Sequence, residues 1–298
     1  MNLARAARPA RLRLITVTVI LAVAGLLAAA TQAASADTGG HNAVRSGRGH
    51  RPVIVLEHGA WADASSWAAV IGRLQAGGFT VYAPPNPLRG LPEDSAYLKD
   101  FLTHNAALAG QPVVLVGHSY GGAVITNAAV GDSEVKALVY VDAFIPDQGE
   151  TLAKLTGAQP GSCLAGNPAD IFNLVPYPGA PAGDVDTYIR QSLVPSCFAS
   201  GLPAAQAAVI AATQRPLAAS TLGEPSGTPA WKTIPSWDVI GTADRVLPPA
   251  EQIFMAKRAR AHITKVNAGH LSMIADPGVV AQLSSKRPKP PAKEGNQS

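Results

Sequence analysis

The sequence has few residues that could bind a metal ion. It contains only two cysteines, Cys163 and Cys197, and seven histidines among its 298 residues. No group of cysteines and histidines has the close spacing that is typical of a zinc site. We therefore expect no metal centre, and the two cysteines need another explanation.

The sequence also lacks an excess of charge of one sign once its N-terminus is set aside. Residues 1–36 hold four of the 24 lysines and arginines and none of the 20 carboxylates, so the rest of the chain has no net charge. Within residues 52–284, acidic side chains outnumber basic ones, because the remaining basic residues are concentrated near the two ends. The basic charge of the whole chain therefore gives no reason to expect a nucleic-acid partner.

Residues 1–36 have the composition of a secretory signal peptide. Four arginines precede an apolar run from Leu14 to Ala30, and Ala34-Ser35-Ala36 offers the small residues that a signal peptidase needs. These arginines include no adjacent pair, which favours general secretion over the twin-arginine route. The alternative is an uncleaved anchor, since the run reaches the lower length limit of a membrane span. We expect cleavage, secretion, and no stable membrane insertion afterwards.

The pattern of residues 52–284 predicts one α/β domain between two disordered segments, a linker at 37–51 and a basic, proline-rich tail at 285–298. Short apolar runs alternate with amphipathic segments in this domain. Strands are expected at 53–56, 80–82, 113–116, 135–141, 236–241 and 263–266, and helices at 65–75, 92–108, 122–130, 249–260 and 276–283. This alternation predicts a mostly parallel sheet with helices on both faces.

Residues 146–232 interrupt this alternation. They are rich in proline, glycine and alanine, and they contain both cysteines. Because a structureless loop of this length is unusual in a compact domain, we predict an inserted cap. Export would allow Cys163 and Cys197 to form a disulfide that fastens the cap, and two free thiols are the alternative.

One stretch, Gly117-His118-Ser119-Tyr120-Gly121, has the G-x-S-x-G pattern. It lies between a predicted buried strand and a predicted helix, which is the context that a nucleophilic serine requires. The glycines permit close approach of the backbone, and the N-terminus of the following helix supplies free N–H groups. We therefore predict that Ser119 is a nucleophile rather than an ordinary turn residue.

A nucleophilic serine needs a basic histidine that is oriented by a carboxylate. On this type of strand–turn–helix motif, the acid and then the histidine follow the serine along the chain. Asp244 follows the strand predicted at 236–241, and His270 follows the last predicted strand. We predict that Ser119, Asp244 and His270 form the triad. Asp142, which also follows a strand, is the alternative acid.

The segment after the first strand, His58-Gly59-Ala60, should supply part of an oxyanion hole. We expect the two donors to be the backbone N–H groups of Ala60 and Tyr120. His58 and His118 are expected to have structural roles. Several aromatic residues could line a pocket under the cap, and the candidates are Trp61 and Phe144.

Taken together, these motifs resemble the α/β-hydrolase superfamily over nearly all of residues 52–284. The similarity is strongest to a bacterial branch related to plant methylesterases and hydroxynitrile lyases. The stretches that carry it are HGAWADASSW, NPLRGL, VVLVGHSYGGAVITNAA, ALVYVDAFIPDQGE, ATQRP, PAWKTIPSW, GTADRVLPP and AGH. The resemblance implies a cofactor-free Ser-His-Asp enzyme with a lid.

The same resemblance narrows the expected chemistry. The plant lyases have a threonine where Gly59 stands and a lysine where Leu271 stands, and this sequence has neither. The nucleophilic aspartate of dehalogenases and epoxide hydrolases is replaced by Ser119. One departure is Glu57, where relatives usually have an apolar residue, and the sequence offers no account of it.

The sequence thus predicts a secreted, monomeric hydrolase that cleaves small-molecule carboxylic esters. Two alternatives remain at this point. One is a different chemistry on the same triad, such as carbon–carbon bond cleavage or cofactor-free perhydrolysis. The other is a receptor-like protein that binds a ligand with little turnover.

Overall fold

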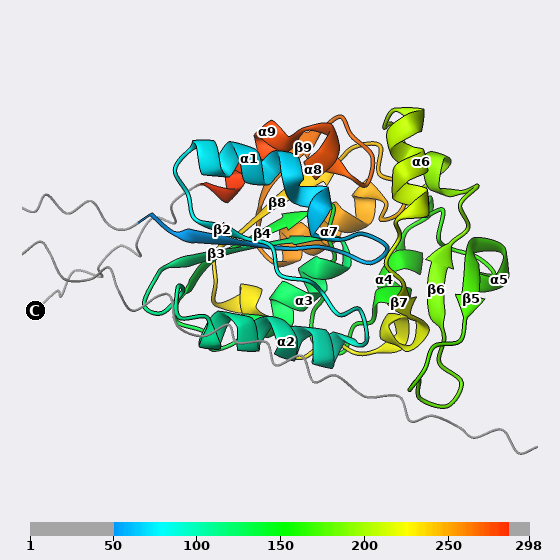
Figure 1. Cartoon of the computed structure of the whole chain (residues 1–298), viewed down its shortest axis with the longest axis horizontal. Coiled ribbons are helices and arrows are strands. Elements are labelled where there is room, and N and C mark those ends of the chain that lie inside the picture. The colour runs from blue at the N-terminus through cyan, green and yellow to red at the C-terminus, as the bar shows by residue number, and fades with distance from the viewer. Residues whose placement is uncertain (1–50, 286–298) are drawn as a thin grey trace, which may run out of the picture. The chain divides into compact units, whose positions relative to one another are not determined.

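The computed structural model describes residues 51–285, which form a parallel sheet with helices on both faces (Figure 1). The strands of this sheet lie in the order β2-β1-β3-β4-β8-β9, and every neighbouring pair is parallel. Their bounds are β1 Val53–Glu57, β2 Val81–Tyr82, β3 Val113–His118, β4 Val135–Val141, β8 Ser236–Gly241 and β9 His262–Val266. The predicted fold class is therefore confirmed.

The central strands are apolar because both of their faces are covered. Every residue of β1 and β3 is buried, whereas the edge strands β2 and β9 are partly exposed. In the register of the sheet, Leu115 lies between Val55 and Leu138. Parallel strands buried on both faces read as continuous apolar runs rather than as alternating ones, which is why their positions were visible in the sequence.

The helices divide between the two faces of the sheet. They are α1 Ala68–Ala76, α2 Leu91–His104, α3 Tyr120–Ala128, α4 Leu152–Ala158, α5 Pro168–Ile171, α6 Ala204–Ala212, α7 Pro249–Arg258, α8 Ser272–Ala275 and α9 Pro277–Ser284. In Figure 1, α1, α8 and α9 lie on one face, and α2 and α3 lie on the other. No helix within residues 51–285 is long and apolar enough to cross a membrane.

The segment between β4 and β8 has strands that the sequence analysis did not foresee. It holds α4, α5 and α6 together with an antiparallel sheet of β5 Phe172–Val175, β6 Asp186–Ile189 and β7 Leu217–Ala218. These strands are short, most of β5 is exposed, and prolines and glycines surround them. Their apolar pattern is therefore too brief to distinguish from that of a loop. Residues 146–232, predicted as the cap, fall within this segment.

The ends of the chain lie outside the described residues. They include the signal peptide expected at 1–36 and nearly all of the linker expected at 37–51 and of the tail expected at 285–298. Inside the described range, the carboxyl ends of β1, β3, β4, β8 and β9 meet at one edge of the sheet, because these strands are parallel. Ligand sites in open α/β sheets form at this edge.

Candidate active site

Ser119 lies at a sharp turn between a strand and a helix. Strand β3 ends at His118 and helix α3 begins at Tyr120, so the serine alone connects them. Its backbone has φ 52° and ψ −122°, a conformation that non-glycine residues rarely adopt. Such strain persists only where the surrounding structure imposes it, and here it raises the side chain above the edge of the sheet.

Two glycines allow the backbone to approach this turn closely. A Cβ atom on Gly121 would lie 2.5 Å from the carbonyl oxygen of Glu57, and one on Gly59 would lie 2.8 Å from the Cβ of Ser119. Both distances are too short for real side chains. Glycine is therefore required at these positions if the loop after β1 is to lie against the serine.

The structure brings Ser119, His270 and Asp244 together in a chain of hydrogen bonds. The Nε2 atom of His270 lies 2.9 Å from the Oγ of Ser119, and its Nδ1 atom lies 2.8 Å from the Oδ2 of Asp244. All three residues are almost completely buried. Burial lowers the pKa of His270, so the imidazole is neutral at pH 7 and can accept a proton.

Asp244 is surrounded by hydrogen-bond donors. Its carboxylate accepts the backbone N–H groups of Val246 and Leu247 at 2.8 and 3.1 Å and the side-chain amide of Gln252 at 2.7 Å. Burial raises the pKa of Asp244, and these hydrogen bonds oppose the rise because they stabilise the charged form. The carboxylate is thus fixed with one oxygen directed at His270.

Asp142, the alternative acid, binds different groups. Its side chain accepts the N–H of Gly241 at 2.7 Å, and the N–H and hydroxyl of Ser272 at 2.8 and 3.0 Å. It therefore connects the loops on which Asp244 and His270 lie, and it has no hydrogen bond to His270 among the described residues. Burial raises its pKa, and the nearby charge of Asp244 raises it further.

The expected oxyanion donors lie in the right region. Ala60 and Tyr120 both line the cavity into which Ser119 opens. Within residues 51–285, the backbone N–H groups of these two residues donate to no protein acceptor. Tyr120 is the first residue of α3, so the positive end of that helix dipole adds to its N–H. Two unused donors beside a serine could stabilise a developing oxyanion.

The two other buried histidines make structural contacts, in line with the expectation. His58 accepts the N–H of Asn86 at 3.0 Å through Nε2, and its other ring nitrogen lies 2.9 Å from the carbonyl oxygen of Gly59. His118 has its Nε2 atom 2.9 Å from the carbonyl oxygen of His270. Burial lowers the pKa of both histidines, so each is neutral and can serve as a hydrogen-bonding spacer between loops.

Glu57, which the sequence left unexplained, is buried at the end of β1. Burial and the nearby charge of Asp94 raise its pKa well above the usual range, which favours the neutral form of the carboxyl group. Asp94 in turn accepts the hydroxyl of Tyr120 at 2.6 Å. A neutral carboxyl group can occupy this position at a much lower cost than a charged one.

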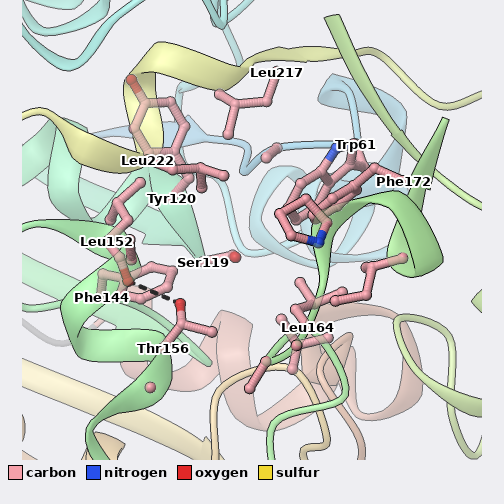
Figure 2. A pocket seen from close by; sticks show the side chains of 18 residues that line it. Trp61, Ser119, Tyr120, Phe144, Leu152, Thr156, Leu164, Phe172, Leu217 and Leu222 are labelled. Atoms are coloured by element: carbon pink, nitrogen blue, oxygen red, sulfur yellow. Dashed lines mark hydrogen bonds between the residues drawn. The ribbon is translucent and has the colours of Figure 1, made fainter. Parts of the chain in front are cut away.

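A cavity of about 320 Å³ opens at Ser119 (Figure 2). Its walls are mostly apolar, and none of the described residues that line it is charged. The candidates Trp61 and Phe144 both contribute. The wall on the cap side comes from Leu152, Ala153, Thr156, Gly157, Leu164, Ala165, Gly166, Pro168, Ile171, Phe172, Leu217 and Leu222.

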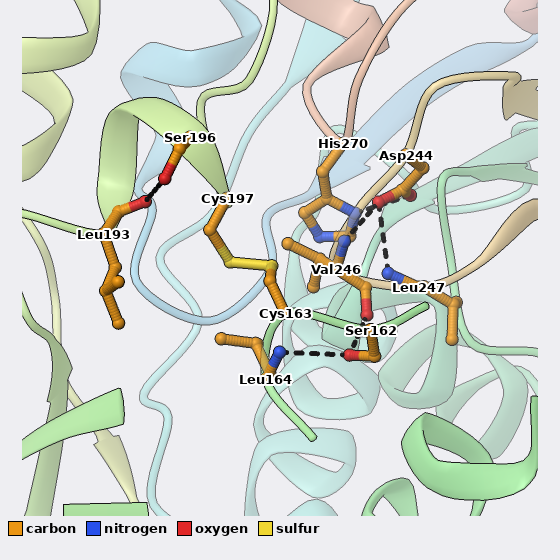
Figure 3. Close-up of a disulfide and its surroundings, with 10 residues drawn as sticks. All are labelled: Ser162, Cys163, Leu164, Leu193, Ser196, Cys197, Asp244, Val246, Leu247 and His270. Atoms are coloured by element: carbon orange, nitrogen blue, oxygen red, sulfur yellow. Dashed lines mark hydrogen bonds and ion pairs between the residues drawn. A yellow bond between two sulfur atoms is a disulfide. The ribbon is translucent and has the colours of Figure 1, made fainter. Parts of the chain in front are cut away.

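Cys163 and Cys197 form a disulfide in the structure, as expected. Figure 3 shows it beside Val246, in the same region as Asp244 and His270. The N–H of Cys163 donates to the carbonyl oxygen of Arg245 at 2.7 Å. Phe198, which follows the second cysteine, packs against the ring of His270 with 5.5 Å between centroids. The disulfide thus joins two parts of the inserted segment next to the candidate site.

Sequence reasoning missed two residues near this site, Gln252 and Asp94. Gln252 donates to Asp244 from helix α7, and the hydroxyl of Tyr120 binds Asp94 on α2. Both contacts join elements that are separate in the sequence, and a lone amide on a helix has no local pattern that marks it. Only the tertiary arrangement identifies them.

The chain matches the model of the alpha/beta hydrolase family over residues 53–283. It is 34% identical over 111 residues to a carbendazim hydrolyzing esterase of Nocardioides, a match that spans 34% of this chain and 46% of that enzyme. About half of that relative's length is therefore matched.

Solved structures show the same fold. Polyneuridine aldehyde esterase superposes with a TM-score of 0.66 at 17% identity, over 79% of this chain and 98% of the other. An extracellular alpha/beta-hydrolase from Paenibacillus, described as homologous to tobacco salicylic acid binding protein 2, gives 0.59 at 20% identity over 78% and 97%. With the family match over most of its length, the chain belongs to the alpha/beta hydrolase family.

Proposed function

We propose that this protein hydrolyses carboxylic esters through an acyl-enzyme on Ser119. The observation that carries the proposal is the hydrogen-bonded chain from Ser119 through His270 to Asp244, at the base of an apolar cavity. Membership of a hydrolase family and similarity to an enzyme described as an esterase support it. The chemistry follows from the positions of five groups: three side chains and two backbone N–H groups.

In the first half of the reaction, the Oγ of Ser119 attacks the ester carbonyl carbon. His270 takes the serine proton at Nε2, and Asp244 stabilises the resulting imidazolium through Nδ1. The negative charge on the carbonyl oxygen is stabilised by the N–H groups of Ala60 and Tyr120, which are otherwise unused. The imidazolium then gives its proton to the alcohol oxygen, and the alcohol leaves.

In the second half, water replaces the alcohol. His270 accepts a proton from the water, whose oxygen attacks the acyl carbon, and the same two N–H groups stabilise the second oxyanion. The acid is released as the proton returns to Ser119. Each step uses groups that are already in place, so no large movement of the site is needed.

The geometry near Gly59 favours ester hydrolysis over lyase chemistry. A side chain at position 59 would collide with Ser119 and with the carbonyl oxygen of His118, so a hydroxyl-bearing residue has no room beside this serine. Leu271 is buried, and it places no cation next to His270. The plant lyases that the sequence resembles have a threonine and a lysine at these two positions, and the resemblance associates the lysine with stabilising cyanide.

We also propose that the protein is exported. The disulfide between Cys163 and Cys197 is of a kind that persists in oxidising compartments. The expected signal peptide at residues 1–36 would direct the chain there. Export is thus a separate part of the proposal, and it is independent of the reaction.

Replacement of the serine tests the reaction. Ser119→Ala removes the nucleophile but keeps the turn, so hydrolysis of a short-chain nitrophenyl ester should fall by at least about a thousandfold. The melting temperature should change little. Ser133→Ala is the matched control, because Ser133 is exposed in the loop before β4, at the opposite edge of the sheet. Its turnover should equal that of the unmodified protein.

Assays with an ester and with a hydroxynitrile distinguish ester hydrolysis from the two alternatives. A lyase would release cyanide from a hydroxynitrile faster than it cleaves esters, and a receptor-like protein would bind ligand without turnover. Ester hydrolysis that survives Ser119→Ala would refute the proposed mechanism.

A further inference from the structure

Trp61 has an unusual position directly after the candidate oxyanion residue Ala60. Its backbone φ is 56°, a left-handed conformation that is unfavourable for a bulky aromatic residue. The residue is only 5% exposed. A strained backbone at a buried residue indicates that the surrounding structure requires this side chain in this place.

The indole of Trp61 is fixed by the inserted segment. Its Nε1 donates to the carbonyl oxygen of Thr187 on β6 at 2.9 Å. The ring stacks on Phe172 with 5.4 Å between centroids, and it meets Phe198 edge-on at 6.2 Å. Two aromatic rings and one hydrogen bond therefore hold the indole between the core and the cap.

Trp61 also lines a second cavity. It has a volume of about 170 Å³ and is formed by the loop after β1, helix α6, and Phe198, Leu271 and Ile274. It reaches the surface, because Val209, one of its lining residues, is 61% exposed. Among the described residues, Trp61 alone lines both this cavity and the one at Ser119.

We propose that Trp61 limits the length of the apolar group that the Ser119 cavity accepts, by closing that cavity against the second one. The proposal rests on the esterase function above and names its substrate class. The cavity at Ser119 has no charged lining, so a carboxylate or ammonium placed there would lose hydration without compensation. Esters whose buried group is uncharged and apolar are therefore the substrates.

The volume of the cavity sets the size of that group. At roughly 30 Å³ for each water-sized group, the cavity of about 320 Å³ holds on the order of ten heavy atoms. A chain that grows toward the loop after β1 meets the indole and goes no further, whereas the lining residues Ala153, Gly157 and Pro168 are exposed at the surface. Without the indole, a chain would continue into the second cavity and from there to the surface.

The first test uses the unmodified protein with two ester series. One series varies the acyl chain of nitrophenyl esters from acetyl to palmitoyl, and the other varies the alcohol of acetate esters over the same lengths. We expect kcat/KM to rise with chain length and then to fall steeply in one of the series, near the length that fills the cavity. If palmitoyl and hexadecyl esters are cleaved as fast as hexanoyl and hexyl esters, the proposal is wrong.

The second test removes the indole. In Trp61→Ala, the ratio of kcat/KM for the longest ester to that for the best medium-length ester should rise by at least about tenfold, because several more methylene groups are buried. Trp61→Phe keeps an aromatic wall and should leave this ratio within about threefold of its original value. Leu152→Ala is the matched control. Leu152 lines the first cavity but not the second, so the longest chain that is cleaved efficiently should grow by only a few carbons.

The ratio of the two kcat/KM values within one variant does not depend on the absolute activity of that variant. An unchanged ratio in Trp61→Ala would overturn the proposal, and Trp61→Leu offers a milder opening if the alanine variant does not fold. Labelling by a fluorophosphonate tests the esterase function separately from the role of Trp61. Loss of labelling and of all ester turnover in the unmodified protein would refute the esterase function, whereas intact labelling without a length limit would refute only the role of Trp61.

Discussion

Two buried carboxyl groups, those of Asp142 and Asp244, lie just beyond the ends of the neighbouring strands β4 and β8. The sequence favoured Asp244 and left Asp142 as the alternative, because both follow a buried strand and precede His270. Their contacts differ in the structure. Asp244 lies 2.8 Å from the imidazole, whereas Asp142 binds backbone and hydroxyl groups of the adjacent loops.

This difference predicts unequal effects of the two amide substitutions. Asp244→Asn should lower kcat by about 10⁴, because the amide cannot hold His270 in the tautomer that accepts the serine proton. Asp142→Asn should cost much less activity and should lower the melting temperature more, since it weakens the contacts between two loops. Measuring kcat and melting temperature for both variants checks this. The reverse ranking in kcat would show that Asp142 is the catalytic acid.

At the scale of elements, the inserted segment is held to the site by the disulfide. The cross-link joins residues 34 positions apart; Cys163 donates to the carbonyl oxygen of Arg245, and Phe198, next to Cys197, packs against the ring of His270. Cavity residues such as Leu164 and Ile171 lie between the two cysteines in the sequence. The disulfide therefore fixes part of the wall of the cavity as well as the fold of the segment.

Removal of the cross-link should destabilise the protein. For a loop of this length, the loss of unfolded-state entropy is worth about 3–4 kcal/mol, so the double substitution Cys163→Ser with Cys197→Ser should lower the free energy of unfolding by about that amount. Denaturant unfolding measures this directly. Thiol titration of the denatured, unreduced protein should find no free thiol, and two free thiols would be evidence against the cross-link.

Some strands of the fold could be predicted from the sequence, and others could not. Strands β1, β3, β4 and β8 were evident because burial on both faces makes them largely apolar, with Lys136 in β4 and Asp238 in β8 as exceptions. The sheet of β5, β6 and β7 was not, because its strands are short, β7 having 2 residues and β5 and β6 having 4 each. Local patterns carry little information in strands of this length.

For the molecule as a whole, the triad candidates could be ordered from the sequence because the family's chain order and the strand ends constrain them. The structure brings Ser119, Asp244 and His270 together as that order requires. The shape of the cavity could not be predicted, because its walls come from segments far apart in the sequence, such as Trp61, Phe144 and Leu217. Substrate choice therefore depends on tertiary contacts between the core and the inserted segment.

The most direct test of the central claim is a rapid-mixing experiment with a nitrophenyl ester, followed by acid quenching and peptide mass analysis. The account predicts an initial burst of about one nitrophenolate per protein molecule and an acyl group on the peptide that contains Ser119. Turnover at a normal rate with no burst would be consistent with rapid deacylation if the acyl group were still found on Ser119. Turnover with no acyl group on Ser119, or with the acyl group on another residue, would contradict the account.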